Sequence, residues 1–180
     1  MNLLMHPPGT LPRSGTYTLH PEHSAVGLAV RQLTRTVRAK VSPLGGELVI
    51  DPDDPGATSV WIDLDAGSLS TGKPERDDVV KGPELLDVDR FPFLRFESRS
   101  VSEDATGRWT VGGDLYVRDV VGEVELDVRL LDTPEDRIAC VASTTLQRST
   151  FGLRWTEQFE RLGLLVGDTV RVHLGVEFGR

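Results

Sequence analysis

Residues near the start of the chain carry atoms that could bind a metal ion or perform acid–base chemistry. His20, Glu22, His23 and Ser24 are close together in the sequence. A zinc site needs several converging ligands, and a nucleophilic serine needs a base and an oxyanion hole. The remaining histidines are scattered, and no Gly-x-Ser-x-Gly turn surrounds Ser24. We therefore expect His23 and Ser24 to satisfy backbone groups at the start of a strand, with no metal site and no catalytic residue.

Cys140, Asp63 and Asp65 carry side chains that could react or titrate. Cys140 is the only cysteine, so the chain forms no internal disulfide, and we expect a small buried apolar residue at this position. Asp63 and Asp65 alternate with apolar residues, so we expect them to face water rather than to act as an acid–base pair. The sequence also lacks a Gly-x-Gly-x-x-Gly or phosphate-binding loop, and we expect no cofactor.

Arg76, Asp77 and Arg148 leave two interpretations open. They could form ion pairs and cap a short helix. Either arginine could instead contact the polar head group of a ligand, such as a diphosphate or a quinone oxygen, because a guanidinium recognises such oxygens well.

The charge and the ends of the chain exclude several classes of function. The 180 residues include 28 acidic and 20 basic side chains, which give a net charge of −8. No run rich in Lys or Arg interrupts this balance, so we expect no nucleic-acid partner, no anionic-membrane surface and no stable membrane insertion. Residues 1–14 lack a charged start followed by an apolar run, and no stretch approaches roughly 18 consecutive apolar residues. We predict a flexible arm over residues 1–14, one domain over residues 15–180 and a cytoplasmic location.

Apolar and polar residues alternate along most of the chain, which is typical of half-buried antiparallel strands. The alternation predicts strands at 16–19, 25–33, 35–41, 46–50, 60–65, 94–101, 109–117, 124–130, 138–147 and 170–178. Turn residues separate them, notably at 42–45, 51–56, 103–107 and 132–134. Short helices are expected over 74–87 and along Trp155, Phe159 and Leu162. Sequential hairpins without a long crossover favour an all-β, up-and-down antiparallel barrel with short helical segments over a sandwich.

Four segments resemble the YceI-like family of lipocalin-like, polyisoprenoid-binding proteins. They are residues 17–33 with the His23-Ser24 pair, residues 68–97, residues 113–128, and residues 147–153 followed by the Gly167-Asp168 turn. The second segment, with its Ser-Leu-x-Thr-Gly, Arg-Asp and Phe-Pro-x-x-x-Phe succession, is the most specific. The resemblance implies an eight-stranded lipocalin-like barrel that holds a long isoprenoid chain and has no assigned catalytic residues.

The alternation and the resemblance together predict a set of residues that line the interior. These are Val26, Leu28, Val30, Ile62, Leu64, Leu94, Phe96, Val111, Leu115, Leu126, Val128, Val172, Leu174 and Val176, with Trp155 and Phe159 as lid candidates. The predicted function is non-catalytic binding, storage or transport of an apolar small-molecule lipid, polyisoprenoid or quinone-like. It would be driven by roughly 25 cal/mol per Å² of buried apolar surface. Two alternatives are a solid barrel acting as a structural or stress-associated interaction module, and an isoprenoid- or quinone-modifying enzyme. The sequence leaves open whether the chain forms a homodimer.

Overall fold

The computed structural model describes residues 13–180 except 52, 132–133, 135, 155–158 and 160–165. In this part of the chain antiparallel strands dominate, with one α-helix and three short 3-10 helices. The strands are β1 (Gly15–Leu19), β2 (Ala25–Gln32), β3 (Arg35–Ile50), β4 (Ser59–Ser70), β5 (Phe93–Glu103), β6 (Trp109–Val117), β7 (Val120–Leu131), β8 (Arg137–Gln147) and β9 (Thr169–Gly179). The helices are η1 (Pro21–His23), η2 (Pro55–Ala57), α1 (Pro74–Lys81) and η3 (Arg148–Phe151).

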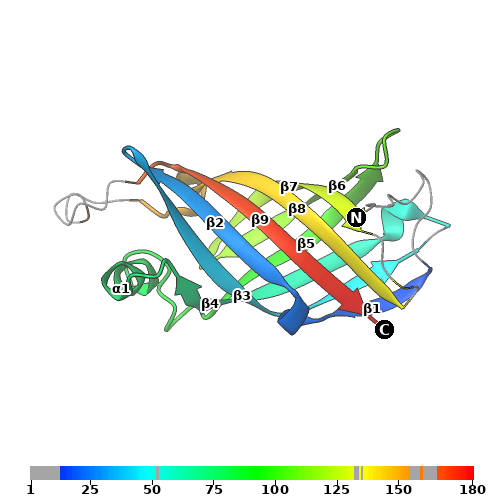
Figure 1. Cartoon of the computed structure of the whole chain (residues 1–180), viewed down its shortest axis with the longest axis horizontal. Coiled ribbons are helices and arrows are strands. Elements are labelled where there is room, and N and C mark those ends of the chain that lie inside the picture. The colour runs from blue at the N-terminus through cyan, green and yellow to red at the C-terminus, as the bar shows by residue number, and fades with distance from the viewer. Residues whose placement is uncertain (1–12, 52, 132–133, 135, 155–158, 160–165) are drawn as a thin grey trace.

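The strands form a closed barrel, as the sequence predicts. From β2 to β9 each strand pairs with the next one in the chain, and β9 returns to pair with β2, so eight strands complete the ring. β1 pairs with the far half of β3 and with the end of β9, so it continues the position of β2 beyond η1. Figure 1 shows α1 and the β2–β3 hairpin at one end of the barrel and the end of β9 at the other. We call these the α1 end and the terminal end.

One predicted turn is wrong. Residues 42–45 do not separate two strands but lie inside β3, which continues from Arg35 to Ile50. The register between β3 and β4 shifts between Lys40 and Ser42 and again between Pro43 and Gly45. Such bulges accommodate a proline, which cannot donate a ladder hydrogen bond, within a strand.

The two helical predictions have different outcomes. The segment 74–87 forms α1 over its first eight residues and then turns. The second predicted helix lies outside the described residues except for Phe159, which is helical and buried. Among the described residues no helix is both long and apolar enough to cross a bilayer.

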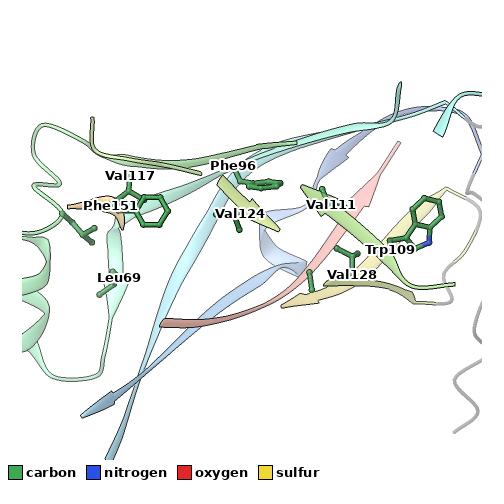
Figure 2. Close-up of a cluster of buried hydrophobic side chains, with 10 residues drawn as sticks. Leu69, Phe96, Trp109, Val111, Val117, Val124, Val128 and Phe151 are labelled. Atoms are coloured by element: carbon green, nitrogen blue, oxygen red, sulfur yellow. The ribbon is translucent and has the colours of Figure 1, made fainter. Parts of the chain in front are cut away.

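The interior of the barrel is filled unevenly along its length. At the terminal end Tyr17, Leu19, Ile138, Val176 and Phe178 pack together, and each is at most 3% exposed. A second cluster lies along β4 to β8 and η3 (Figure 2), with Trp109, Val111 and Val128 toward one side of the view and Leu69, Val117 and Phe151 toward the other. The terminal end is therefore closed by packed side chains.

Candidate functional site

A cavity of about 270 Å³ lies in the half of the barrel nearer α1. Its volume is close to the lower end of the range for small-molecule sites. Side chains that alternate along every barrel strand supply most of its wall: Val26, Leu28, Val30, Val37, Ala39, Val41, Ile62, Leu64, Leu69, Leu94, Phe96, Leu115, Val117, Val124, Leu126, Thr144, Leu146, Val170, Val172 and Leu174.

Several leucines in this wall point inward yet keep accessible surface. Leu28, Leu64, Leu126 and Leu174 are half-buried, whereas inward-facing residues at the terminal end are buried. A side chain in a filled core is covered by its neighbours on all sides. These leucines are not, because they face the cavity instead of another side chain.

The wall at the α1 end comes from helices and connections rather than from strands. Val80 of α1, Leu85 and Leu86 of the following segment, and Phe151 of η3 all line the cavity. Gly122 of β7 admits the Phe151 ring, since a Cβ atom there would lie 2.6 Å from it. Sequence reasoning missed this wall because these residues follow no strand periodicity. It also missed several strand residues of the wall, such as Val37, Ala39 and Leu146, although their alternation could have revealed them.

Most of the predicted lining residues lie at the cavity, but three do not. Val111 and Val128 belong to the packed cluster of Figure 2, and Val176 packs at the terminal end. Alternation identifies the inward face of a strand over its whole length, whereas only the half nearer α1 reaches the cavity. Of the two lid candidates, Phe159 is buried but is not part of the described cavity wall, and Trp155 lies outside the described residues.

Arg76 is a cation at the edge of this apolar wall. It lines the cavity from α1 and is half-buried. In the described part of the chain its guanidinium has no hydrogen bond to a side chain or backbone carbonyl and no carboxylate partner. Of the two interpretations left open for Arg76, the ion pair is therefore not formed among the described residues, and the five N–H donors of Arg76 are available to another partner.

Asp77 is engaged in fixing the start of α1. Its Oδ1 accepts hydrogen bonds from Thr71 N at 2.8 Å and from Thr71 Oγ1 at 2.6 Å, and its Oδ2 accepts one from Ser70 Oγ at 3.0 Å. Burial alone would raise the pKa of Asp77, but the hydrogen bonds from Thr71 and Ser70, together with the charge of Lys81, lower it below its usual value. Asp77 does not cap α1, whose N-cap residue Lys73 makes no side-chain cap hydrogen bond. Asp77 instead holds the turn before the helix in place.

Arg148 also lines the cavity, but its donors are used. Nε donates to the carbonyl of Gly167 at 3.1 Å, Nη1 to that of Leu153 at 2.5 Å and Nη2 to that of Val166 at 3.3 Å. Burial lowers the pKa of Arg148, and the nearby Asp168 carboxylate opposes this effect. Arg148 therefore ties together the two ends of the connection between η3 and β9.

Thr144 adds a neutral polar group inside the barrel. It lines the cavity from β8 and is half-buried. Within the described residues its hydroxyl makes no hydrogen bond. The accessible surface of the cavity is entirely apolar, so Thr144 lines it with carbon atoms rather than with its hydroxyl.

His20 lies beside η1 and His23 within it, and His173 lies on the outer face of β9 between two residues that line the cavity, so none of these three imidazoles is part of the cavity wall. Ser24 Oγ donates to His20 O at 2.8 Å and accepts from Glu177 N at 3.1 Å, which confirms the backbone role predicted for this hydroxyl. The His23 imidazole instead contacts the Glu177 carboxylate, with Nδ1 and Oε1 2.9 Å apart. No group of three potential metal ligands gathers among the described residues.

Two other predicted positions can be placed. Asp63 does not simply face water, because Arg95 of β5 donates to both of its carboxylate oxygens at 2.6 Å. Cys140 contacts apolar clusters of the interior, and burial raises the pKa of its thiol to about 12. At neutral pH Cys140 is therefore a protonated, weakly nucleophilic thiol, in agreement with its predicted apolar role.

Relatives found by sequence and relatives found by structure indicate the same family. A UPF0312 protein of Staphylococcus aureus is 21% identical over 169 residues, which cover 90% of this chain and 96% of the relative. The crystal structure of Burkholderia cenocepacia BcnA superposes with a TM-score of 0.76 at 18% identity, covering 88% of this chain and 98% of that one. A polyisoprenoid binding domain from Saccharophagus degradans, implicated in plant cell wall breakdown, superposes with a TM-score of 0.71 at 14% identity, covering 91% of this chain and 97% of that one. The profile of the YceI-like domain matches residues 17–178, and the chain therefore belongs to the YceI-like family.

Proposed function

We propose that the barrel binds a long apolar isoprenoid-type lipid, polyisoprenoid or quinone-like, and holds it without changing it chemically. The observation that carries this proposal is the aliphatic cavity with its half-buried inward-facing leucines. Transfer of an apolar chain from water to such a wall is favourable by roughly 25 cal/mol per Å² buried. The polyisoprenoid binding domain with a similar fold supports the choice of ligand class.

The polar end of the lipid is assigned to Arg76. Arg76 belongs to the cavity wall, which it lines with carbon atoms, and its guanidinium donors are unused by described residues, whereas Arg148 donates to backbone carbonyls. A phosphate or diphosphate would accept paired hydrogen bonds from Arg76. A quinone carbonyl would accept a single hydrogen bond from Arg76.

Binding is favoured over catalysis by the small number of polar groups in the wall. In the described wall only Thr71, Arg76, Thr144 and Arg148 have polar side chains. Thr71 is bound to Asp77 and Arg148 to the backbone. Acid–base catalysis requires a positioned proton donor or acceptor whose pKa is near the working pH. The solid-barrel alternative is disfavoured by the cavity itself.

The test titrates delipidated protein with two probes, decylubiquinone and geranylgeranyl diphosphate. Leu126→Trp places a larger side chain in the cavity and should abolish binding of both probes. The control Val121→Trp adds the same side chain at a position that is 52% exposed on the neighbouring part of β7, and should bind both normally. Calorimetry measures the affinities, and circular dichroism checks that each variant is folded. Equal binding by the two variants would refute the cavity as the site.

A further arm of the same titration tests the head-group assignment. Arg76→Gln should weaken binding of geranylgeranyl diphosphate by about 10- to 100-fold, since a charge-assisted hydrogen bond contributes about 1.5 to 3 kcal/mol. Its effect on decylubiquinone should be smaller. Lys73→Gln removes an exposed charge one turn earlier and should change neither affinity appreciably. Probe recovered with an altered mass would favour the enzyme alternative.

A further inference from the structure

The β2–β3 hairpin carries an unusual charge for this protein. Residues 25–46 contain Arg31, Arg35, Arg38 and Lys40 and no acidic residue, although the whole chain has a net charge of −8. All four side chains are exposed. The expectation that the protein has no surface for an anionic membrane is based on the total charge, which does not reveal this local cluster of basic residues.

The neighbouring strand extends the same surface. Ala29 of β2 pairs with Arg38 of β3 on one side and with Arg171 of β9 on the other. Adjacent strands are spaced by about 4.8 Å, so the Cα atoms of Arg38 and Arg171 lie about 10 Å apart across a small side chain. We define the basic face as Arg31, Arg38, Lys40 and Arg171, which share the outer side of the barrel. Arg35 alternates in step with the inward-facing Val37 and lies beside the hairpin tip.

The basic face lacks the carboxylates that neutralise arginines elsewhere on the barrel. Arg95 pairs with Asp63, Arg99 with Asp114 and Arg108 with Asp127, all between neighbouring strands. Within the described residues no member of the basic face forms an ion pair. Neither β2 nor β8 contains an acidic residue, and β3 and β9 contain none before Glu47 and Glu177.

An exposed apolar side chain stands at the tip of the hairpin. Leu33 is 74% exposed, more than any other large hydrophobic residue in the described part of the chain. Its φ of +48° is a backbone conformation that glycine or asparagine adopts more readily, so turn geometry does not favour a leucine here. Val30 and Val37, which flank the tip, line the cavity, so Leu33 lies at the cavity end of the barrel. Figure 1 shows the β2–β3 hairpin at the same end as α1.

We propose that the basic face and Leu33 dock the α1 end of the barrel onto an anionic phospholipid bilayer. Clustered Lys and Arg side chains are attracted to anionic lipids over about one Debye length, roughly 10 Å at moderate salt, so the charge of the basic face matters more than the net charge of the protein. The acidic residues Glu75, Asp77 and Asp78 belong to α1, and we expect the basic face rather than the helix to contact the lipid. Leu33 enters the boundary between head groups and acyl chains, and burial of its apolar side chain there strengthens binding to the membrane. Residues 25–46 contain no aromatic side chain for stacking on bases, and this favours a bilayer over a single-stranded nucleic acid. The docking goes beyond the proposed function and requires no bound ligand.

The experiment measures sedimentation of the full chain with vesicles of phosphatidylcholine mixed with phosphatidylglycerol and with vesicles of phosphatidylcholine alone. We expect binding to the mixed vesicles only, with loss at high salt. Arg38→Gln should weaken it about fivefold, the effect of removing one charge near an anionic surface. The matched control Arg129→Gln changes an exposed arginine on the outer face of β7 and should bind like wild type. Leu33→Ser should weaken binding while keeping its dependence on salt.

Several outcomes would overturn the docking surface. These are absence of binding to mixed vesicles, equal effects of Arg38→Gln and Arg129→Gln, and equally tight binding to DNA that is sensitive to the same variants. The probe titration described above, repeated on Arg38→Gln, separates this proposal from the proposed function. If docking fails while probe binding persists, only the docking is refuted. If probe binding fails while delipidated protein still sediments with mixed vesicles, the docking stands and the lipid-binding function is refuted.

Discussion

Two arginines of the cavity wall show how identical residue types acquire different roles. Both were predicted as head-group candidates from their place in recognisable motifs. The guanidinium of Arg76 has no partner among the described residues. That of Arg148 donates hydrogen bonds to the carbonyls of Leu153, Val166 and Gly167. The sequence could not separate them, because the carbonyls that bind Arg148 lie up to 19 residues away along the chain.

Asp77 gives a pH-dependent prediction at the residue scale. Replacing Asp77 by Ala leaves the donors of Ser70 and Thr71 without their acceptor, and should lower the free energy of unfolding by about 1 to 2 kcal/mol at neutral pH. Because folding lowers the pKa of Asp77, its contribution is present above the unfolded pKa of about 4 and is lost as the pH falls through the folded pKa.

Urea unfolding of wild type and variant, measured from neutral to acid pH, checks this prediction. The two stability curves should converge only at acid pH. Asp78→Ala removes the exposed neighbouring carboxylate and should leave stability nearly unchanged. A difference between wild type and Asp77→Ala that grows as the pH falls would contradict the assigned role.

At the scale of the strands, alternation predicted which side chains point inward but not what they face. Leu126 and Val128 are two residues apart on the same face of β7, yet Leu126 lines the cavity and Val128 lies in a packed cluster. Their difference depends on how far along the barrel each residue lies, which follows from strand tilt and register. The position of a residue along the barrel axis depends on which strands pair and in which register, and these pairings join residues that are far apart in the sequence.

The turn wrongly expected at residues 42–45 has a related cause. Ser-Pro-Leu-Gly is a good turn sequence by local preference. In the barrel, β3 is long enough to pair with β2 over its first part and with β1 over its last, so stopping at Ser42 would leave β1 without a partner for its backbone groups. Tertiary pairing therefore overrides the local signal, and bulges absorb the proline.

A matched pair of leucines tests whether the two halves of the barrel differ in packing. Leu19→Ala, at a 3% exposed position in the terminal cluster, should cost about 2 to 5 kcal/mol of unfolding free energy. Leu126→Ala, in the cavity wall of delipidated protein, should cost less than about 2 kcal/mol, because this side chain already faces a void. Denaturant unfolding measures both. Equal losses would indicate a uniformly filled barrel.

At the scale of the whole molecule, the barrel is polarised along its axis. Packed side chains close the terminal end, and the cavity, Arg76, the basic face and Leu33 lie toward the α1 end. This arrangement places the apolar cavity, the proposed head-group contact Arg76 and the proposed membrane contact at one end. A lipid carried in the barrel would then enter and leave at the end that contacts the bilayer.

The central claim is that the cavity holds an apolar lipid, and native mass spectrometry of protein purified from its own host tests it most directly. We expect wild-type protein to carry additional mass that organic extraction removes and that fragments as an isoprenoid-type lipid. Leu126→Trp, purified in the same way, should carry none, whereas Val121→Trp should carry the same mass as wild type. Wild-type protein with only the mass of the chain, or a retained lipid unaffected by Leu126→Trp, would contradict the account.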